Sequence, residues 1–314
     1  MSQKDELSAK VDQVFESQLD FLRELVAIES VSSDPTKVGE MQKGARFVAE
    51  AFKSLGMDTK ICDAPKPDGE PGAPAVIAKK HADGAAPTVL LYAHYDVQPP
   101  GDGAGWDSPP FQAEVRGERI YGRGTSDDGA GVAVHYGVLD AFKGDLPVNT
   151  TVFIEGEEEV GSPSFSAFLE QYKEDLEADV IIVADSSNWT EDVPAITSSL
   201  RGVATIDVTV KVLEQAVHSG MFGGPVLDAI TVAARLITTL HDDAGDVAVK
   251  GLGGNPTSEV EWEESLFRAD AGTVEGLELA GTADLAARLW TMPAISVIGI
   301  DAPTVAESAN AIVP

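Results

Sequence analysis

Three short apolar runs, each followed by acidic or imidazole side chains, constrain the fold of this chain more than any other feature. They cover residues 89–92, 150–154 and 180–184 and are expected to form buried strands. The stretches with helical periodicity cover residues 7–29, 41–55, 132–142 and 164–176. Strands that alternate with helices predict an α/β fold, a layered domain whose central mixed sheet has helices on both faces. Because ligands bind beyond the carboxyl ends of strands in such sheets, the sequence predicts a site where the runs end.

The first run ends in His94 and Asp96, and Pro99 and Pro100 then prevent further strand pairing. Side chains two residues apart on a strand point the same way, so we expect this pair to share one face. A metal-binding imidazole usually donates its second N–H to a carboxylate, and the H-x-D spacing supplies both groups. Taken alone, the pair is equally typical of a surface loop, so the other strand ends decide between the two interpretations.

Acidic side chains also follow the other runs or stand at a strand-to-helix turn. They are Asp127 and Asp128, the glutamates at 157–159, and Asp185. Each has an ordinary explanation as a helix cap, a solvated loop or a turn. Their coincidence at equivalent strand ends favours a metal site, because gathered carboxylates repel one another unless cations lie among them.

A mixed set of imidazole and carboxylate ligands suits zinc, manganese or cobalt better than calcium. Two such cations bridged by one carboxylate would activate a water and polarise a carbonyl oxygen. Glu158 and Glu159 are neighbours, so a turn can direct one to a metal and the other to the water. The pattern itself leaves open which glutamate does which.

The composition and the alternation of predicted strands and helices change near residue 198. We therefore predict a layered domain over 1–198 and a smaller α+β domain over 199–314. In the second domain, alternating apolar residues predict a strand over 201–212. Helical periodicity predicts a helix over 225–240, and an apolar run predicts a final strand near 292–300. We expect the strands of this domain to form an antiparallel sheet.

Composition excludes some classes of partner. Acidic residues number 52 against 22 basic ones, a formal net charge of −30, which disfavours binding to nucleic acid or to an anionic membrane. Cys62 is the only cysteine, so no intrachain disulfide forms, as is typical of a reducing compartment. The sequence shows neither a signal peptide nor an apolar stretch that could span a membrane, and we expect a cytoplasmic protein.

Five strings in the chain, HYDVQP, YGRGTSDDGAG, EGEEEVGS, an Asp after VIIVA, and HSGMFGG, resemble motifs of the M20 family of metallopeptidases. The form HYDVQP is most similar to the carnosinase-like dipeptidase branch of that family. This resemblance implies a catalytic domain with a lid domain that dimerises. It also implies metal-dependent hydrolysis of dipeptides or short peptides with a free C-terminal carboxylate. The alternatives are an N-acyl-amino-acid deacylase or carboxypeptidase, and a non-catalytic metal-binding or dimerisation fragment.

The resemblance implies two divalent metal ions, expected to be Zn²⁺, with Mn²⁺ or Co²⁺ as the alternatives. In it, His94 and Asp185 hold one ion, Asp127 bridges both, and Glu159 binds the second. Family members usually carry Lys where Gly129 stands, which we expect to alter the start of the helix rather than the ligands.

The same resemblance assigns three further roles. Glu158 is the general base, Asp96 orients the imidazole, and His218 stabilises the tetrahedral intermediate at the neighbouring site of a homodimer. Asn310 matches, weakly, a lid residue near the substrate carboxylate.

The family's second metal-binding histidine lies in a segment expected beyond Pro314. We therefore expect the sequence to be a fragment, with both domains incomplete at the C-terminus and the second metal short of one ligand. Three other histidines are given structural interpretations: His135 as a packed or partly exposed helix residue, and His81 and His241 as solvated residues in polar turns.

Overall fold

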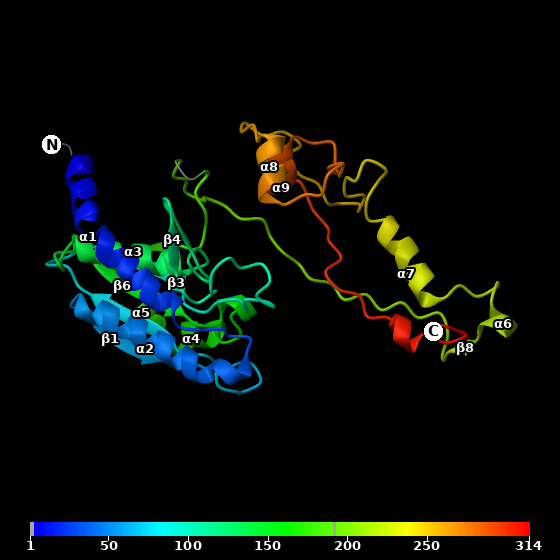
Figure 1. Ribbon diagram of the computed structural model, residues 1–314, viewed down its shortest axis with the longest axis horizontal. Coiled ribbons are helices and arrows are strands. Elements are labelled where there is room, and N and C mark those ends of the chain that lie inside the picture. Colours follow the sequence, from blue (N-terminus) through cyan, green and yellow to red (C-terminus); the bar gives the residue numbers. More distant parts are fainter. Residues whose placement is uncertain (1–2, 191–192) are drawn as a thin grey trace. The chain divides into compact units, whose positions relative to one another are not determined.

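The computed structural model describes residues 3–190 and 193–314 (Figure 1). The chain divides into two units, Met1–Ala195 and Ile196–Pro314. Each is described here by itself.

The first unit is built on a five-stranded sheet of order β1-β2-β6-β3-β7. Its strands are β1 (Asp58–Cys62), β2 (Ala75–Lys80), β3 (Thr88–His94), β6 (Asn149–Glu155) and β7 (Val180–Val183). β1, β2 and β6 pair antiparallel, whereas β3 runs parallel to both β6 and β7. The predicted central mixed sheet is therefore confirmed.

Three helices cover one face of this sheet: α1 (Gln3–Val26), α2 (Val38–Ser54) and α3 (Gly129–Ala141). Their apolar stripes form one buried cluster with alternate residues of the strands, as helical periodicity requires. The helix predicted from residue 132 begins earlier, at Gly129, because Asp128 caps it. Gly56, just after α2, has the positive φ of 76° that ends a helix at low steric cost.

The opposite face packs against α4 (Phe165–Gln171) and α5 (Lys173–Leu176). Phe153 of β6 and Phe168 of α4 lie at the centre of the buried cluster on this side. The single helix predicted over 164–176 is thus broken into two near Tyr172. With helices on both faces, the predicted layered α/β class is confirmed.

β7 corrects one expectation. The sequence predicts a buried strand, but residues 180–183 of β7 are 48–62% exposed. β7 lies at the end of the sheet order and pairs only with β3, so it has a neighbouring strand on one side. An apolar run identifies a strand, but it does not tell a central strand from an edge strand.

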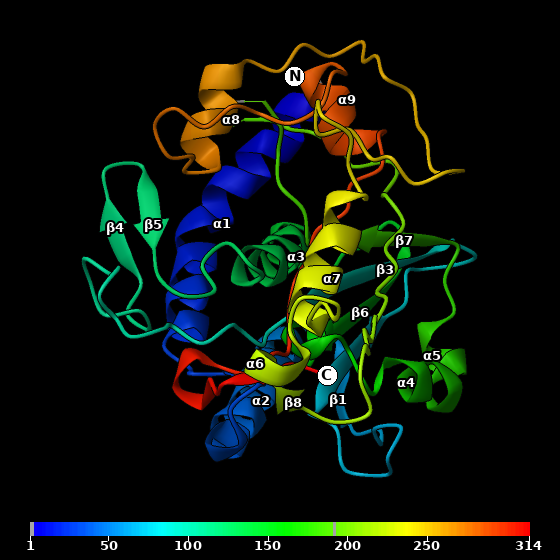
Figure 2. The same ribbon diagram turned by 90° about the vertical axis from the view of Figure 1, so that its right-hand side faces the viewer.

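The remaining elements of the first unit are short. β4 (Glu114–Arg116) and β5 (Arg119–Tyr121) form a hairpin separate from the main sheet (Figure 2). Two 3₁₀ turns are η1 (Pro35–Lys37) and η2 (Glu158–Val160).

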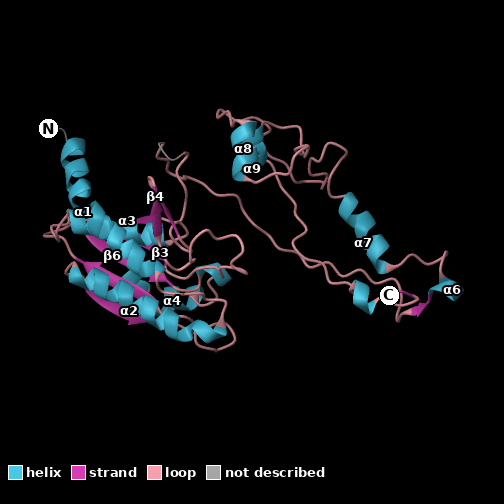
Figure 3. Cartoon of the chain, in the orientation of Figure 1, coloured by secondary structure: helices cyan, strands magenta, loops and turns pink. Residues whose placement is uncertain are grey.

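The second unit has short helices joined by long loops (Figure 3). They are α6 (Ser219–Phe222), α7 (Ala229–Thr238), α8 (Glu264–Asp270), α9 (Leu285–Trp290) and η3 (Val305–Glu307). β8 (Val217–His218) and β9 (Ala311–Ile312) pair antiparallel. The helix predicted over 225–240 is confirmed as α7.

The two long strands predicted for this unit are wrong. Residues 201–212 and 292–300 contain no strand, and Val203 and Ile298 are 95% and 84% exposed. A strand requires a hydrogen-bonded neighbour, which apolar alternation alone does not supply. Among the described residues, no helix has the length and apolar character needed to cross a membrane.

Candidate metal centre

The carboxyl ends of three parallel strands bring the site together. His94 ends β3 and lies opposite Glu155, the last residue of β6. On the other side of β3, Tyr92 pairs with Val183 of β7, and Asp185 follows two residues later. This is the sheet edge at which the sequence predicts a site.

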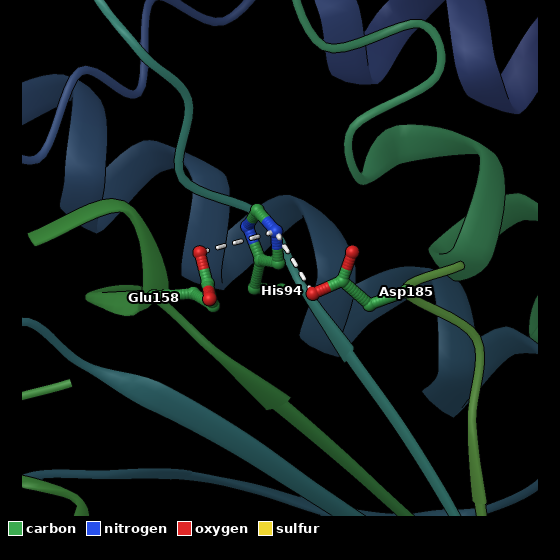
Figure 4. Close-up of side chains that lie close together, drawn as sticks. All are labelled: His94, Glu158 and Asp185. Carbon is green, nitrogen blue, oxygen red and sulfur yellow. Dashed lines mark ion pairs between the residues drawn. The ribbon is translucent and has the colours of Figure 1, made fainter. Parts of the chain in front are cut away.

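The His94 ring is the centre of a group of acidic side chains. Its Nε2 lies 3.1 Å from Asp127 Oδ1, 3.8 Å from Glu158 Oε2 and 3.9 Å from Asp185 Oδ2. The ligand atoms of His94, Glu158 and Asp185 all lie within 4.8 Å of one another (Figure 4). An imidazole nitrogen with several carboxylate oxygens is a donor set that fits zinc, manganese or cobalt.

Asp96 connects the imidazole to the turn that carries the glutamates. His94 Nδ1 lies 3.0 Å from the backbone oxygen of Asp96 and 3.3 Å from its Oδ1, so Nδ1 carries a proton and leaves Nε2 to face the acidic group. The two carboxylate oxygens of Asp96 accept hydrogen bonds from the backbone N–H groups of Glu158 and Glu159, each at 3.1 Å. The side chain of Asp96 is fully buried, so these contacts fix ring and turn together.

The three neighbouring glutamates have different surroundings. Glu158 faces the imidazole, whereas Glu159 accepts hydrogen bonds from the backbone N–H of Gln98 at 3.2 Å and from its side-chain amide at 2.8 Å. Glu157 is buried and accepts from the backbone N–H groups of Ala73 and Ser164. The acidic run is therefore not a solvated loop, since Glu157 ties it to the core and Gln98 holds Glu159.

The paired aspartates before α3 also divide their contacts. Asp128 is 1% exposed and caps α3 by accepting from Gly131 N–H, while its second oxygen accepts from the backbone N–H of His94, both at 3.1 Å. The helix-cap interpretation therefore holds for Asp128. Asp127, whose side chain is 66% exposed, instead extends toward His94 Nε2.

The charges in this group perturb one another. Burial lowers the pKa of His94, but the hydrogen bond and charge of Asp96, with the charges of Asp128 and Asp185, raise it to about 10. Burial raises the pKa of Asp128 to about 7 and also raises the pKa of Glu158. Crowded acids of this kind are the environment in which a divalent cation relieves repulsion.

His218 lies in the second unit, where β8 and β9 place it beside Asn310. Its Nδ1 accepts from the N–H of Gly220 at 3.0 Å, and its Nε2 lies 3.3 Å from the Asn310 side-chain amide. The hydroxyl of Ser219 donates to the Asn310 side-chain oxygen. The pair that the resemblance selects thus forms one exposed polar cluster within its unit.

Two contributors to the site were not identified from the sequence. Gln98 holds Glu159, and its place two residues after Asp96 is the signal that could have indicated it. The bond from Asp128 to the His94 backbone joins residues 34 positions apart, and no local pattern indicates it.

Comparisons with known proteins show what the chain is similar to. A sequence profile of peptidase family M20/M25/M40 matches residues 90–306. A cysteinylglycine-S-conjugate dipeptidase of Corynebacterium striatum is 33% identical over 93% of this chain and 65% of its own length. The human beta-Ala-His dipeptidase is 31% identical over 89% of this chain and 59% of its own length.

Among solved structures, that of human carnosine dipeptidase 1 superimposes with a TM-score of 0.71 at 24% identity. The likeness covers 99% of this chain and 70% of the other, and it shows a shared fold. The chain spans about three fifths to two thirds of the length of the two curated relatives.

Proposed function

The chain belongs to peptidase family M20/M25/M40, and from that premise we propose that it acts in metal-dependent hydrolysis of dipeptides or short peptides with a free C-terminal carboxylate. The observation that carries the proposal is the grouping of His94, Glu158 and Asp185 within 4.8 Å at the carboxyl edge of the sheet. The two curated relatives described above are named as dipeptidases, which favours this substrate class.

We propose two divalent cations at this edge, Zn²⁺ first and Mn²⁺ or Co²⁺ as the alternatives. His94 and Asp185 would hold one, Glu159 the other, and Asp127 would contact both. When bound, such ions lower the pKa of a water and polarise the scissile carbonyl. Gln98 supports this assignment of Glu159, because metal-binding carboxylates are commonly oriented by hydrogen bonds from neighbouring groups.

Glu158 is the proposed general base. Its carboxylate lies beside the imidazole of His94. Asp96 holds the backbone N–H of Glu158, which fixes the position of the residue and leaves the carboxylate available to take up and release a proton. In hydrolysis it takes the proton of the attacking water and delivers it to the leaving amine. His218 is proposed to donate a hydrogen bond to the developing oxyanion.

Three further properties are proposed. Residues 1–198 are proposed to form the catalytic domain and residues 199–314 the lid domain. The lid domain is proposed to form a homodimer that supplies His218 to the neighbouring site. The buried, unpaired Cys62 fits a reducing compartment, and we propose a cytoplasmic location.

Calorimetric titration of the 314-residue chain with Zn²⁺ and Mn²⁺ tests the metal centre, and turnover of a dipeptide panel beside N-acetylated amino acids by the full-length protein tests the reaction. We expect binding at micromolar metal and cleavage of dipeptides. An Asp185→Asn variant is the matched control, since it should lower metal affinity. Faster turnover of the acetylated compounds would favour a deacylase, and metal binding with no turnover would favour a non-catalytic module. Absence of metal binding would contradict the metal centre itself.

A further inference from the structure

A buried carboxylate without a role in the proposed chemistry lies directly beside the metal centre. Glu155 ends β6 opposite His94 and is 2% exposed. Burial raises the pKa of Glu155, in part offset by hydrogen bonds from two hydroxyl groups. A buried acid is costly unless hydrogen-bonded, so the partners of Glu155 indicate what it does.

The two hydroxyls reach Glu155 from different elements. The phenol of Tyr92, on the neighbouring strand β3, donates to Oε1, and the hydroxyl of Ser162 donates to the same oxygen at 3.0 Å. Tyr92 and Phe153 contact each other on the α4 face, with ring centroids 6.1 Å apart. Glu155 thus stands at the boundary between that apolar cluster and the polar group around His94.

Ser162 closes the loop that contains both functional glutamates. The loop starts at Glu155, passes through Glu158 and Glu159 in η2, and returns at Ser162. Ser162 has a φ of 49°, in the left-handed region that residues other than glycine seldom adopt. Its backbone N–H donates to the Glu157 carbonyl at 2.8 Å, while its hydroxyl donates to Glu155. The carboxylate of Glu155 therefore joins the two ends of the loop.

We propose that Glu155 is a positioning residue, which clamps the loop through Ser162 and Tyr92 so that Glu158 keeps its place beside His94 and Glu159 its place on Gln98. The clamp complements Asp96, which holds the same turn by accepting hydrogen bonds from two of its backbone N–H groups. Its effect on turnover rests on the proposed function, but its effect on loop order does not.

The test compares Glu155→Leu, which removes the acceptor, with Glu155→Gln, which keeps a carbonyl oxygen for both hydroxyls. Hydrogen exchange of residues 156–162 is measured by fragment mass spectrometry in each variant. We expect exchange about tenfold faster in Glu155→Leu, as loss of buried hydrogen bonds implies, and near-normal exchange in Glu155→Gln. In the dipeptide assay, kcat should fall with KM little changed in Glu155→Leu and recover in Glu155→Gln.

Single-hydroxyl variants keep the inference testable if Glu155→Leu fails to fold. Tyr92→Phe and Ser162→Ala each remove one donor and should each accelerate exchange of the loop. Tyr172→Phe is the matched control, because its hydroxyl donates to the Asp63 carbonyl on the same face of the sheet, away from the loop. Loop exchange in Tyr92→Phe and Ser162→Ala equal to that in Tyr172→Phe would overturn the proposal. Since exchange needs no turnover, a chain that cleaves no dipeptide would contradict the proposed function alone.

Discussion

The two histidines of the proposed site, the metal ligand His94 and the oxyanion donor His218, stand in contrasting surroundings. His94 of the first unit is fully buried at the end of a seven-residue strand, with its ring, its backbone N–H and its flanking turn all held by aspartates. His218 of the second unit is exposed, in a two-residue strand, and its contacts come from Gly220 and Asn310. In the first unit the residues that place the functional groups also stabilise the fold. In the second, the contacts of His218 are exposed and lie at one end of a two-stranded pair.

Packing explains this difference. The sheet of the first unit has an apolar cluster on each face, so the strand ends are rigid and a side chain at their tip has few alternatives. In the second unit, large apolar residues such as Val203 and Ile206 remain mostly exposed. A substitution in the second unit should change activity without lowering the free energy of unfolding. A substitution beneath His94 should lower both the activity and the free energy of unfolding.

The largest expected effect is loss of Glu158, the proposed general base. Glu158→Gln should lower kcat by about 10²–10⁴-fold with metal affinity retained, because the group that accepts the proton is removed. Glu159→Gln is the matched comparison variant, and its main effect should be a lower metal affinity. The Glu158 side chain is 39% exposed, so the unfolding temperature of the Glu158→Gln chain should match that of the unmodified chain. Unchanged kcat in Glu158→Gln would end this assignment, and lost metal affinity in it would exchange the two roles.

The next effect is in the second unit. His218→Asn should lower kcat by about 10²–10³-fold, as expected when a donor to the oxyanion is lost, with no change in unfolding temperature or metal affinity. His241→Asn, a change of the same kind in the same unit, is the control. If metal affinity in His218→Asn fell as much as kcat, His218 would act through metal binding, and the contrast with His94 would not hold.

A mixing experiment sharpens this prediction. If His218 acts at the neighbouring site of a dimer, mixed Glu158→Gln and His218→Asn chains should regain part of the activity that each lacks alone. In a mixed dimer, one site then combines an intact Glu158 with an intact His218. No recovery in chains shown by ultracentrifugation to exchange partners would contradict action across a dimer.

Asp96 is where function and stability should fall together. Asp96→Ala should lower metal affinity about 10–100-fold, because the imidazole loses its orienting partner. The same change leaves two backbone N–H groups without acceptors, so the unfolding temperature should also fall. Asp228→Ala is a matched control, since Asp228 also accepts from a backbone N–H, at the start of α7, in the other unit. Normal metal affinity in Asp96→Ala would refute the orienting role.

The sequence predicted those features that depend on local pattern. Apolar runs located three of the five strands of the central sheet, β3, β6 and β7, and the acids at their ends located the edge where His94, Glu158 and Asp185 meet. Such predictions succeed because periodicity and strand polarity are local properties, and parallel strands bring their carboxyl ends to one edge.

What escaped prediction depends on neighbours far along the chain. β7 lies at the end of the sheet and its side chains are exposed on both faces, which an apolar run does not indicate. The absence of strands at 201–212 and 292–300 follows from the absence of ladder partners for them in the described part of the second unit. The clamps on the site are likewise non-local, since Gln98 and Glu159 are 61 positions apart. An acid at a strand end can be found in a sequence, but the local pattern does not show which distant residue will donate a hydrogen bond to it.

The smallest predicted effect concerns His135, a buried histidine outside the metal centre. It is 3% exposed in α3, and its Nε2 donates to the Tyr92 carbonyl at 2.9 Å. Burial lowers the pKa of His135, so the unfolded chain binds a proton that the folded chain does not. The corresponding stability is fully present above the unfolded pKa of about 6.5 and is lost as pH falls below it, by at most about 1.4 kcal/mol per pH unit. Urea unfolding between pH 7.5 and 5.0 should therefore show a shallower loss of stability in His135→Gln than in the unmodified chain, whereas His81→Gln, a change at a histidine in a polar turn, should keep the original slope. Equal slopes in all three chains would mean that His135 takes up its proton alike in the folded and the unfolded chain.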